Sequence, residues 1–102
     1  MNTPAFEVLA EPNRRRILDL LREGEQPAGA IGDVLTISQP GVSRHLRVLR
    51  EAGLVRVREA GQRRLYSIRP EPLAEIDAWL APYRKLWSAS LDALEKHLDQ
   101  EQ

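Results

Sequence analysis

The 102-residue sequence contains no cysteine, and this absence excludes several kinds of chemistry at once. Disulfide bonds, thiolate metal sites, cysteine nucleophiles and cysteine-based redox sensing all require a thiol. No stretch approaches the roughly 20 apolar residues that cross a membrane, and the N-terminus lacks the apolar core of a signal peptide. We therefore expect a single domain over residues 1–102 that works in the cytoplasm without a membrane partner.

Groups that could catalyse a reaction are also scarce. The chain has two histidines, no glycine-rich phosphate loop and no nucleophile paired with a base, so the usual components of an active site are missing. The scattered carboxylates and histidines do not suggest a tetrahedral metal site. We expect neither an enzyme nor a bound metal or cofactor.

The formal net charge is zero, but the charges are distributed unevenly along the chain. Residues 1–37 have a net charge of −2 and residues 70–102 a net charge of −4, whereas residues 38–69 contain eight arginines and two glutamates and have a net charge of +6. A local basic surface on a neutral chain is typical of a module that docks on phosphates. The middle third is therefore the candidate nucleic-acid interface.

Apolar residues recur every three or four positions through the first third of the chain, which predicts helices. We expect a short helix over residues 4–10 and a second over residues 11–24, with Pro12 in its first turn and Gly24 at its C-terminal stop. A third helix over residues 26–35 is a weaker prediction, because each of its two glycines costs about 1 kcal/mol relative to alanine.

The stretch SQPGVSRHLRVLREAGL, residues 38–54, predicts a fourth helix. Ser38 is a suitable N-cap, and Pro40 falls in the first turn, where a missing N–H does no harm. Gly53 suits the position just after the last turn. The short third helix, the tight turn and this basic helix together form a helix-turn-helix.

The apolar period changes to two over residues 54–68, with Gly61 between the two runs, which predicts a β-hairpin with a basic flank. Residues 72–99 then give the longest helical pattern, which Pro82 must kink or split. Its apolar seam is too long for so small a domain to cover alone, so we expect burial against a partner. The predicted fold is mainly α with a small β-hairpin, a winged helix-turn-helix.

A helical wheel of residues 39–52 separates a core side from a basic side. In helix-turn-helix docking, the N-terminal residues of the second helix reach the base edges, where Gln can pair with adenine and Arg with guanine. Arg47 and Arg50 lie further along and are better placed for backbone phosphates. The residues expected in the core are Val42, Leu46 and Leu49, and the candidates for base contacts are Gln39, Pro40, Ser43 and Arg44.

A solvated basic face on a surface helix would explain any single arginine. The capped helix, the eight arginines within 32 residues and the basic hairpin together favour DNA binding. The alternative is a winged-helix module for protein–protein contact or for RNA. The basic recognition edge weakens the first possibility, and the second usually involves stacking aromatics, of which residues 38–69 contain only Tyr66.

Residues 9–68 resemble the winged-helix core of the arsenic-repressor (ArsR) family of bacterial transcription regulators. The most diagnostic segments are EPNRRRILDLL, SQPGVSRHLRVLREAGLV and GQRRLYSI. The resemblance implies a homodimer that binds a palindromic operator in double-stranded DNA and represses transcription until an effector releases it. It implies base contacts at the four positions named above, wing contacts near Gln62, Arg63 and Arg64, and a dimer interface of the first and last helices, where we expect Phe6, Leu80, Tyr83, Trp87, Leu91 and Leu94.

The chain departs from the family's metal-sensing members. The third helix has no cysteine, the segment EID at residues 75–77 lacks a histidine, and His97 is followed three residues later by Gln100. Metal sensing is therefore disfavoured. The last helix, with WLAPYRKLW, resembles a subgroup without recognised metal sites. An unidentified small-molecule effector and simple repression of the protein's own operon both stay open.

Three further features allow more than one interpretation. The aromatic ladder of Trp79, Tyr83 and Trp87 predicts either packing in the dimer core or an effector pocket for an apolar molecule. The arginines at 14–16 form either a phosphate contact or a surface cluster. His45 lies toward the apolar side of its helix, and we expect it to be partly buried and hydrogen-bonded locally.

Overall fold

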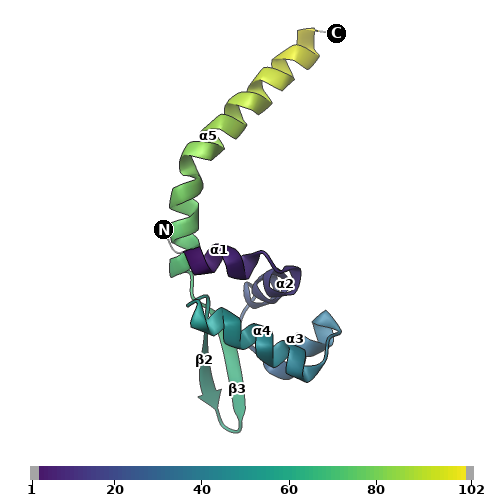
Figure 1. Ribbon diagram of the computed structural model, residues 1–102. Helices are drawn as coiled ribbons and strands as arrows, with labels where there is room; N and C mark the ends of the chain where they lie inside the picture. Colours follow the sequence, from purple (N-terminus) through teal and green to yellow (C-terminus); the bar gives the residue numbers. More distant parts are fainter. Residues whose placement is uncertain (1–2, 101–102) are drawn as a thin grey trace.

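The computed structural model describes residues 3–100, so the outer limits of the expected 1–102 domain lie outside the described residues. The elements follow one another in the predicted order, with one additional strand (Figure 1). They are α1 (Thr3–Leu9), α2 (Pro12–Leu21), β1 (Gln26–Pro27), α3 (Ala28–Leu35), α4 (Gln39–Glu51), β2 (Val55–Ala60), β3 (Arg63–Ile68) and α5 (Glu71–Gln100).

Local capping fixes both ends of α4, as the sequence predicts. The Ser38 hydroxyl accepts a hydrogen bond from the Gly41 N–H at 3.2 Å. At the other end, Gly53 has a φ of +76°, and the N–H groups of Gly53 and Leu54 donate at 2.9 Å to the carbonyls of Arg50 and Leu49. This pair of hydrogen bonds forms the Schellman motif, which needs a left-handed residue after the helix.

The second helix is shorter than predicted. It begins as expected, because the Glu11 side chain accepts from the Arg14 N–H and Pro12 occupies the first turn. It ends at Leu21 and not near Gly24, because the next residues tighten into bonds three residues apart, Glu23 N–H to Leu20 and Gly24 N–H to Leu21. Such a tightened last turn is a common way to satisfy terminal carbonyls.

The sheet has three antiparallel strands in the order β1-β3-β2. The hairpin of β2 and β3 turns at Gly61, which has a φ of +66°, and its register pairs Val55 with Ile68. The strand β1 was not predicted, and the helical prediction for residues 26–27 is wrong. Pro27 pairs with Leu65 at the sheet edge, where a residue without an N–H is tolerated.

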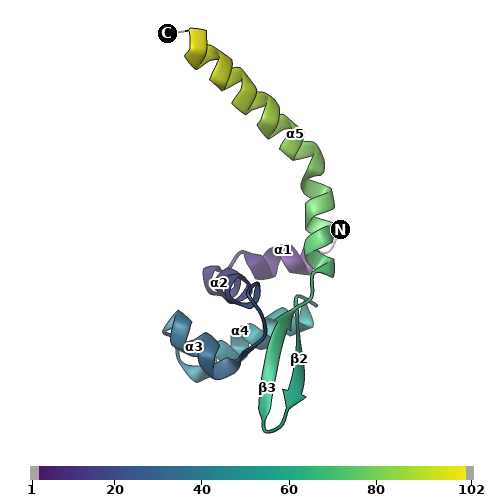
Figure 2. The same cartoon turned by 180° about the vertical axis from the view of Figure 1, so that it is seen from behind.

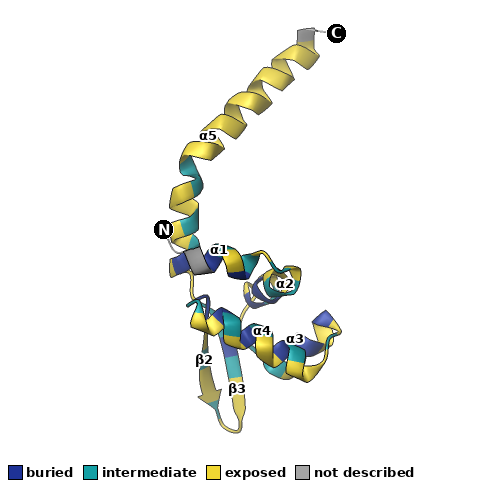
Figure 3. Cartoon of the chain, viewed as in Figure 1, coloured by how far each residue is buried: buried dark blue, intermediate teal, exposed yellow. Residues whose placement is uncertain are grey.

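The core lies between the helices and the sheet (Figure 3). The three α4 residues predicted to face inward are almost completely inaccessible, so the predicted orientation of this helix is confirmed. The largest fully buried side chains are Ile17, Ile31, Leu35, Val42, Leu46, Leu49 and Leu54.

The last helix leaves this body and extends away from it (Figures 1 and 2). Leu73 and Ile76, at its start, pack against the core, whereas the residues after Ala81 are exposed through residue 99 (Figure 3). The helix includes Pro82 and is continuous but bent (Figure 1), so Pro82 is accommodated without a split.

The overall dimensions reflect this protruding helix. The described chain measures 62 by 30 by 21 Å and has a radius of gyration of 18.2 Å, against about 13 Å for a compact domain of 100 residues. None of the described helices, α5 included, is long and apolar enough to cross a membrane.

Candidate nucleic-acid interface

The helix α4, which is the second helix of the helix-turn-helix, and the wing formed by β2 and β3 enclose an open groove of about 370 Å³, which we call the recognition groove. Six of the nine predicted DNA contacts line it, together with the buried Tyr66 of β3. Gln39, Gln62 and Arg63 do not line the groove, although all three are exposed. The six that the fold brings together are Pro40, Ser43, Arg44, Arg47, Arg50 and Arg64.

The arginines of this groove are not neutralised by the protein. Within residues 3–100, the guanidinium groups of Arg44, Arg47 and Arg50 have no hydrogen-bond or ion-pair partner, and the same holds for Arg64. Four cations around one concave surface create a positive potential that attracts phosphates. The groove can therefore bind a polyanion such as a nucleic-acid backbone.

Two other arginines of the basic middle third are already paired. Arg58 of β2 makes two hydrogen bonds to the Glu25 carboxylate, at 2.7 and 2.8 Å, and the Arg69 guanidinium lies 3.9 Å from Glu71. The hydrogen bond and positive charge of Arg58 lower the pKa of Glu25. The net charge of residues 38–69 therefore overstates the charge available to a ligand.

A close approach of α3 and α4 positions the N-terminal end of α4, the recognition helix of the helix-turn-helix. Gly32 is buried, and a Cβ at this position would lie 3.0 Å from Gln39 Nε2 and 3.3 Å from Val42 Cγ2. The connection also uses Thr36, which has a φ of +56° and donates its N–H to the Gly32 carbonyl at 2.9 Å. Helical propensity alone made Gly32 a weakness; the structure gives it a packing role.

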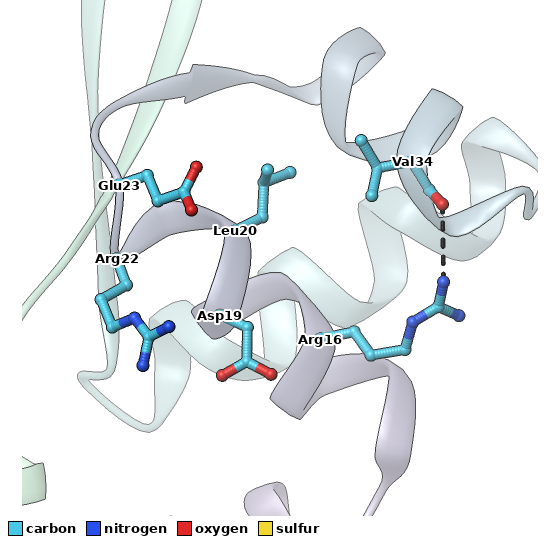
Figure 4. A pocket seen from close by; sticks show the side chains of 6 residues that line it. All are labelled: Arg16, Asp19, Leu20, Arg22, Glu23 and Val34. Carbon is cyan, nitrogen blue, oxygen red and sulfur yellow. Dashed lines mark hydrogen bonds between the residues drawn. The ribbon is translucent and has the colours of Figure 1, made fainter.

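The three consecutive arginines of α2 bind main-chain carbonyls. Arg14 Nε donates to the Val8 carbonyl at 2.7 Å, and Arg15 donates to the Leu9 carbonyl at 2.7 Å. Arg16 reaches the Val34 carbonyl in the last turn of α3, as Figure 4 shows. Cations at helix C-termini satisfy otherwise unpaired carbonyls. The arginines therefore join α1, α2 and α3, which neither sequence-based interpretation included.

His45 of α4 differs from its prediction in one respect. Its side chain is 16% exposed, as expected, but the buried Nδ1 has no hydrogen-bond partner among residues 3–100, so the predicted local hydrogen bond is wrong. The Glu11 carboxylate lies 3.8 Å from this nitrogen and accepts a hydrogen bond from the Arg14 N–H. No three histidine, aspartate or glutamate side chains within residues 3–100 gather where they could hold a metal ion.

The predicted dimer residues occupy two environments. Phe6 and Leu80 are half-buried, and the rings of Phe6 and Trp79 meet in a T-shaped contact with centroids 5.4 Å apart. Trp79 in turn lies 4.8 Å from Tyr83. This contact between α1 and α5 was not predicted from the sequence, and neither was the exposed Leu86. The remaining predicted residues, Tyr83, Trp87, Leu91 and Leu94, are exposed.

A helix-turn-helix followed by a basic hairpin defines the winged helix-turn-helix class, in which the second helix of the motif docks in the major groove of DNA. The family model described as a helix-turn-helix domain matches residues 9–58. Over 75 residues, the chain is 36% identical to the transcriptional repressor SdpR of Bacillus subtilis (strain 168), covering 74% of this chain and 83% of SdpR.

Solved structures give the same result. The crystal structure of the ArsR-family transcriptional regulator RHA00566 is 29% identical, with a TM-score of 0.73 over 83% of this chain and 88% of that one. The solution structure of the homodimeric winged helix-turn-helix domain of Mb0332 from Mycobacterium bovis is 32% identical. Its TM-score is 0.66, and the match covers 80% of this chain and 76% of that one. The chain belongs to the ArsR family of transcriptional regulators, which are DNA-binding proteins and not enzymes.

Proposed function

We propose that the chain is a homodimeric repressor of its own operon, a single domain that binds a palindromic operator through the helix at 38–52 and the wing at 54–68. The observation that carries this proposal is the groove between α4 and the wing, whose four arginines have no partner within residues 3–100. The relationship to SdpR, a transcriptional repressor, supports the direction of regulation.

The groove suggests a division of labour along α4. Arg44 lies near the N-terminal end of the helix, where recognition helices contact base edges, and its free guanidinium suits guanine O6 and N7. Gln39, Pro40 and Ser43 complete the proposed base-contacting edge. We assign Arg47 and Arg50 to backbone phosphates.

The wing would contribute Gln62, Arg63 and Arg64 to backbone contacts. If Arg47, Arg50, Arg63 and Arg64 of both protomers neutralise phosphates, eight contacts form, and log K should fall with log salt concentration with a slope of about −7. A protein–protein module would show no such dependence on phosphate contacts.

The proposed dimer rests on the unburied apolar stripe of α5. Trp87 is 55% exposed and Leu91 65% exposed, and large apolar patches on isolated chains mark interaction sites. Two copies related by a two-fold axis would also present two recognition helices to a palindromic site. The homodimeric state of the Mb0332 domain supports this assembly.

Titration of labelled DNA from upstream of the protein's own gene tests the proposal. Fluorescence anisotropy should show binding at low salt, the steep salt dependence above, and displacement by unlabelled operator but not by unrelated duplex. Equal displacement by unrelated DNA, or no binding at low salt, would contradict operator recognition. Preferential displacement by single-stranded RNA would favour the RNA-binding alternative.

The proposed location is the cytoplasm, and any small-molecule effector is unidentified.

A further inference from the structure

A second concave surface lies away from the recognition groove, around α2. It has a volume of about 420 Å³ and is lined by apolar side chains from four elements, with Arg15, Asp19 and Arg22 at its polar positions. We call this surface the α2 groove. Its apolar residues are Leu9 of α1, Leu18 of α2, Ile68 of β3 and Leu73 of α5.

The distal part of α5, residues 86–99, carries an apolar face that the rest of the described chain leaves exposed. Leu91, Leu94 and Leu98 continue the stripe that begins at Leu73 and Ile76, but each is more than half exposed. Figures 1 and 2 show that this part of the helix points away from the rest of its own chain. Within residues 3–100, the rest of the chain therefore leaves this apolar face uncovered, and a second molecule could bury it.

The charges beside the two surfaces are complementary. On a wheel of 100° per residue, Asp92, Glu95 and Asp99 all fall on one flank of the distal α5 stripe. At the α2 groove, the Arg22 guanidinium has no hydrogen-bond or ion-pair partner within residues 3–100. Figure 4 shows its side chain extending from the C-terminal end of α2, on the same side as that of Asp19.

Dimer symmetry brings these two surfaces together. In an antiparallel two-fold pair of helices, the distal end of one helix lies beside the start of the other. The start of α5 contributes Leu73 to the α2 groove, and Leu94 lies about 32 Å further along the helix. A partner helix crossing near Tyr83 would therefore carry its own distal leucines to this groove.

We propose that the distal part of α5 from one protomer docks in the α2 groove of its partner, with Leu91, Leu94 and Leu98 in the groove and Glu95 facing Arg22. This inference rests on the proposed homodimer and extends its interface from α1 and α5 to α2. The contact forms twice in the dimer, and it gives the apolar lining of each groove a specific occupant.

The absence of native cysteine permits a direct test by disulfide crosslinking. The double variant Arg22→Cys/Glu95→Cys should give a covalent dimer under mild oxidation, because the partner's distal α5 brings the two side chains together. The matched control is Arg22→Cys/Lys96→Cys, since Lys96 lies on the face of α5 opposite the stripe. Crosslinking of the first pair should be at least about tenfold faster, because a disulfide requires Cβ atoms about 4 Å apart.

A charge exchange provides an independent readout. Arg22 and Glu95 are both exposed, so each single reversal, Arg22→Glu or Glu95→Arg, should leave the fold intact. Each should raise the dimer dissociation constant in sedimentation equilibrium by about tenfold, and the double reversal should restore much of the loss.

The outcomes separate this contact from the dimer itself. A dimer whose two cysteine pairs crosslink equally slowly, and which binds an apolar dye at the α2 groove, would overturn the docking and leave the homodimer intact. Equal and fast crosslinking of both pairs would also overturn it, as random collision. A monomeric protein would overturn both proposals, whereas selective crosslinking with rescue by the double reversal would support the docking.

Discussion

Substituting the two glycines of α3 separates helix propensity from packing. Gly29 and Gly32 lie three residues apart on the same helix, and neither has a positive φ. A Cβ at Gly29 would meet no atom of the described residues within 4 Å, whereas a Cβ at Gly32 would lie 3.3 Å from Val42 Cγ2 and 3.0 Å from Gln39 Nε2. The same change, Gly to Ala, should therefore have opposite effects at the two positions.

The magnitudes follow from these contacts. Gly29→Ala should stabilise the protein by about 0.5–1 kcal/mol, through reduced entropy of the unfolded chain and better helix propensity. Gly32→Ala gains the same term, but the exposed Gln39 and the fully buried Val42 must each give way by a few tenths of an ångström. Overpacking a core costs about 1–3 kcal/mol, so we expect a net destabilisation of about 1 kcal/mol.

Thermal and urea unfolding at equal protein concentration would measure both effects. For a domain of this size, 1 kcal/mol corresponds to a shift in Tm of about 4–8 °C, so the two variants should lie well apart on opposite sides of the parent protein. Gly32→Ala should also weaken DNA binding, because Gln39 and Val42 belong to the recognition helix, and Gly29→Ala should not. Equal stabilisation by both substitutions would refute the close α3–α4 packing as the reason for glycine at position 32.

Three further predictions concern charge and assembly. Arg44→Ala should cost about 1–3 kcal/mol of operator affinity and relax base preference at one position, whereas Arg64→Ala should weaken binding evenly across sequences and reduce the salt slope of a dimer by about 2; an unchanged preference after Arg44→Ala would contradict the base contact. Trp87→Glu should give monomers in light scattering, and a surviving dimer would count against the α5 interface. Because Arg58 lowers the pKa of Glu25, their pair stabilises the fold above the ordinary carboxyl pKa of 4.5 and loses that contribution as the pH falls through the folded-state pKa. Glu25→Gln should therefore reduce the loss of stability on acidification, measured by urea unfolding across that range.

Elements specified by neighbouring residues were predictable from the sequence. Ser38 and Gly53 mark the two ends of α4 through hydrogen bonds that span three to five residues. The hairpin likewise follows from alternation on both sides of Gly61. The basic groove was predictable in composition because most of its residues lie on one face of one helix.

Features that depend on long-range contacts were not predictable. The strand β1 exists because Gln26 and Pro27 pair with residues of β3 nearly forty positions away, and two residues carry no periodicity of their own. The contact between Phe6 and Trp79 joins the first helix to the last. Gly32 carried a propensity penalty in the sequence, and only the crossing of two helices explains why that penalty is accepted.

The arginines show why net charge is a poor guide to this family member. Those at 14–16 bind carbonyls at helix ends, and Arg58, Arg69 and Arg84 lie within ion-pair distance of carboxylates. Those of the recognition groove have no partner within residues 3–100. A polyanion responds to the local field of free cations over about a Debye length, roughly 8–10 Å at physiological salt, and not to the sum over the chain. A neutral protein can therefore present a strongly positive surface to DNA, provided that its acidic residues neutralise arginines elsewhere or lie on the distant α5.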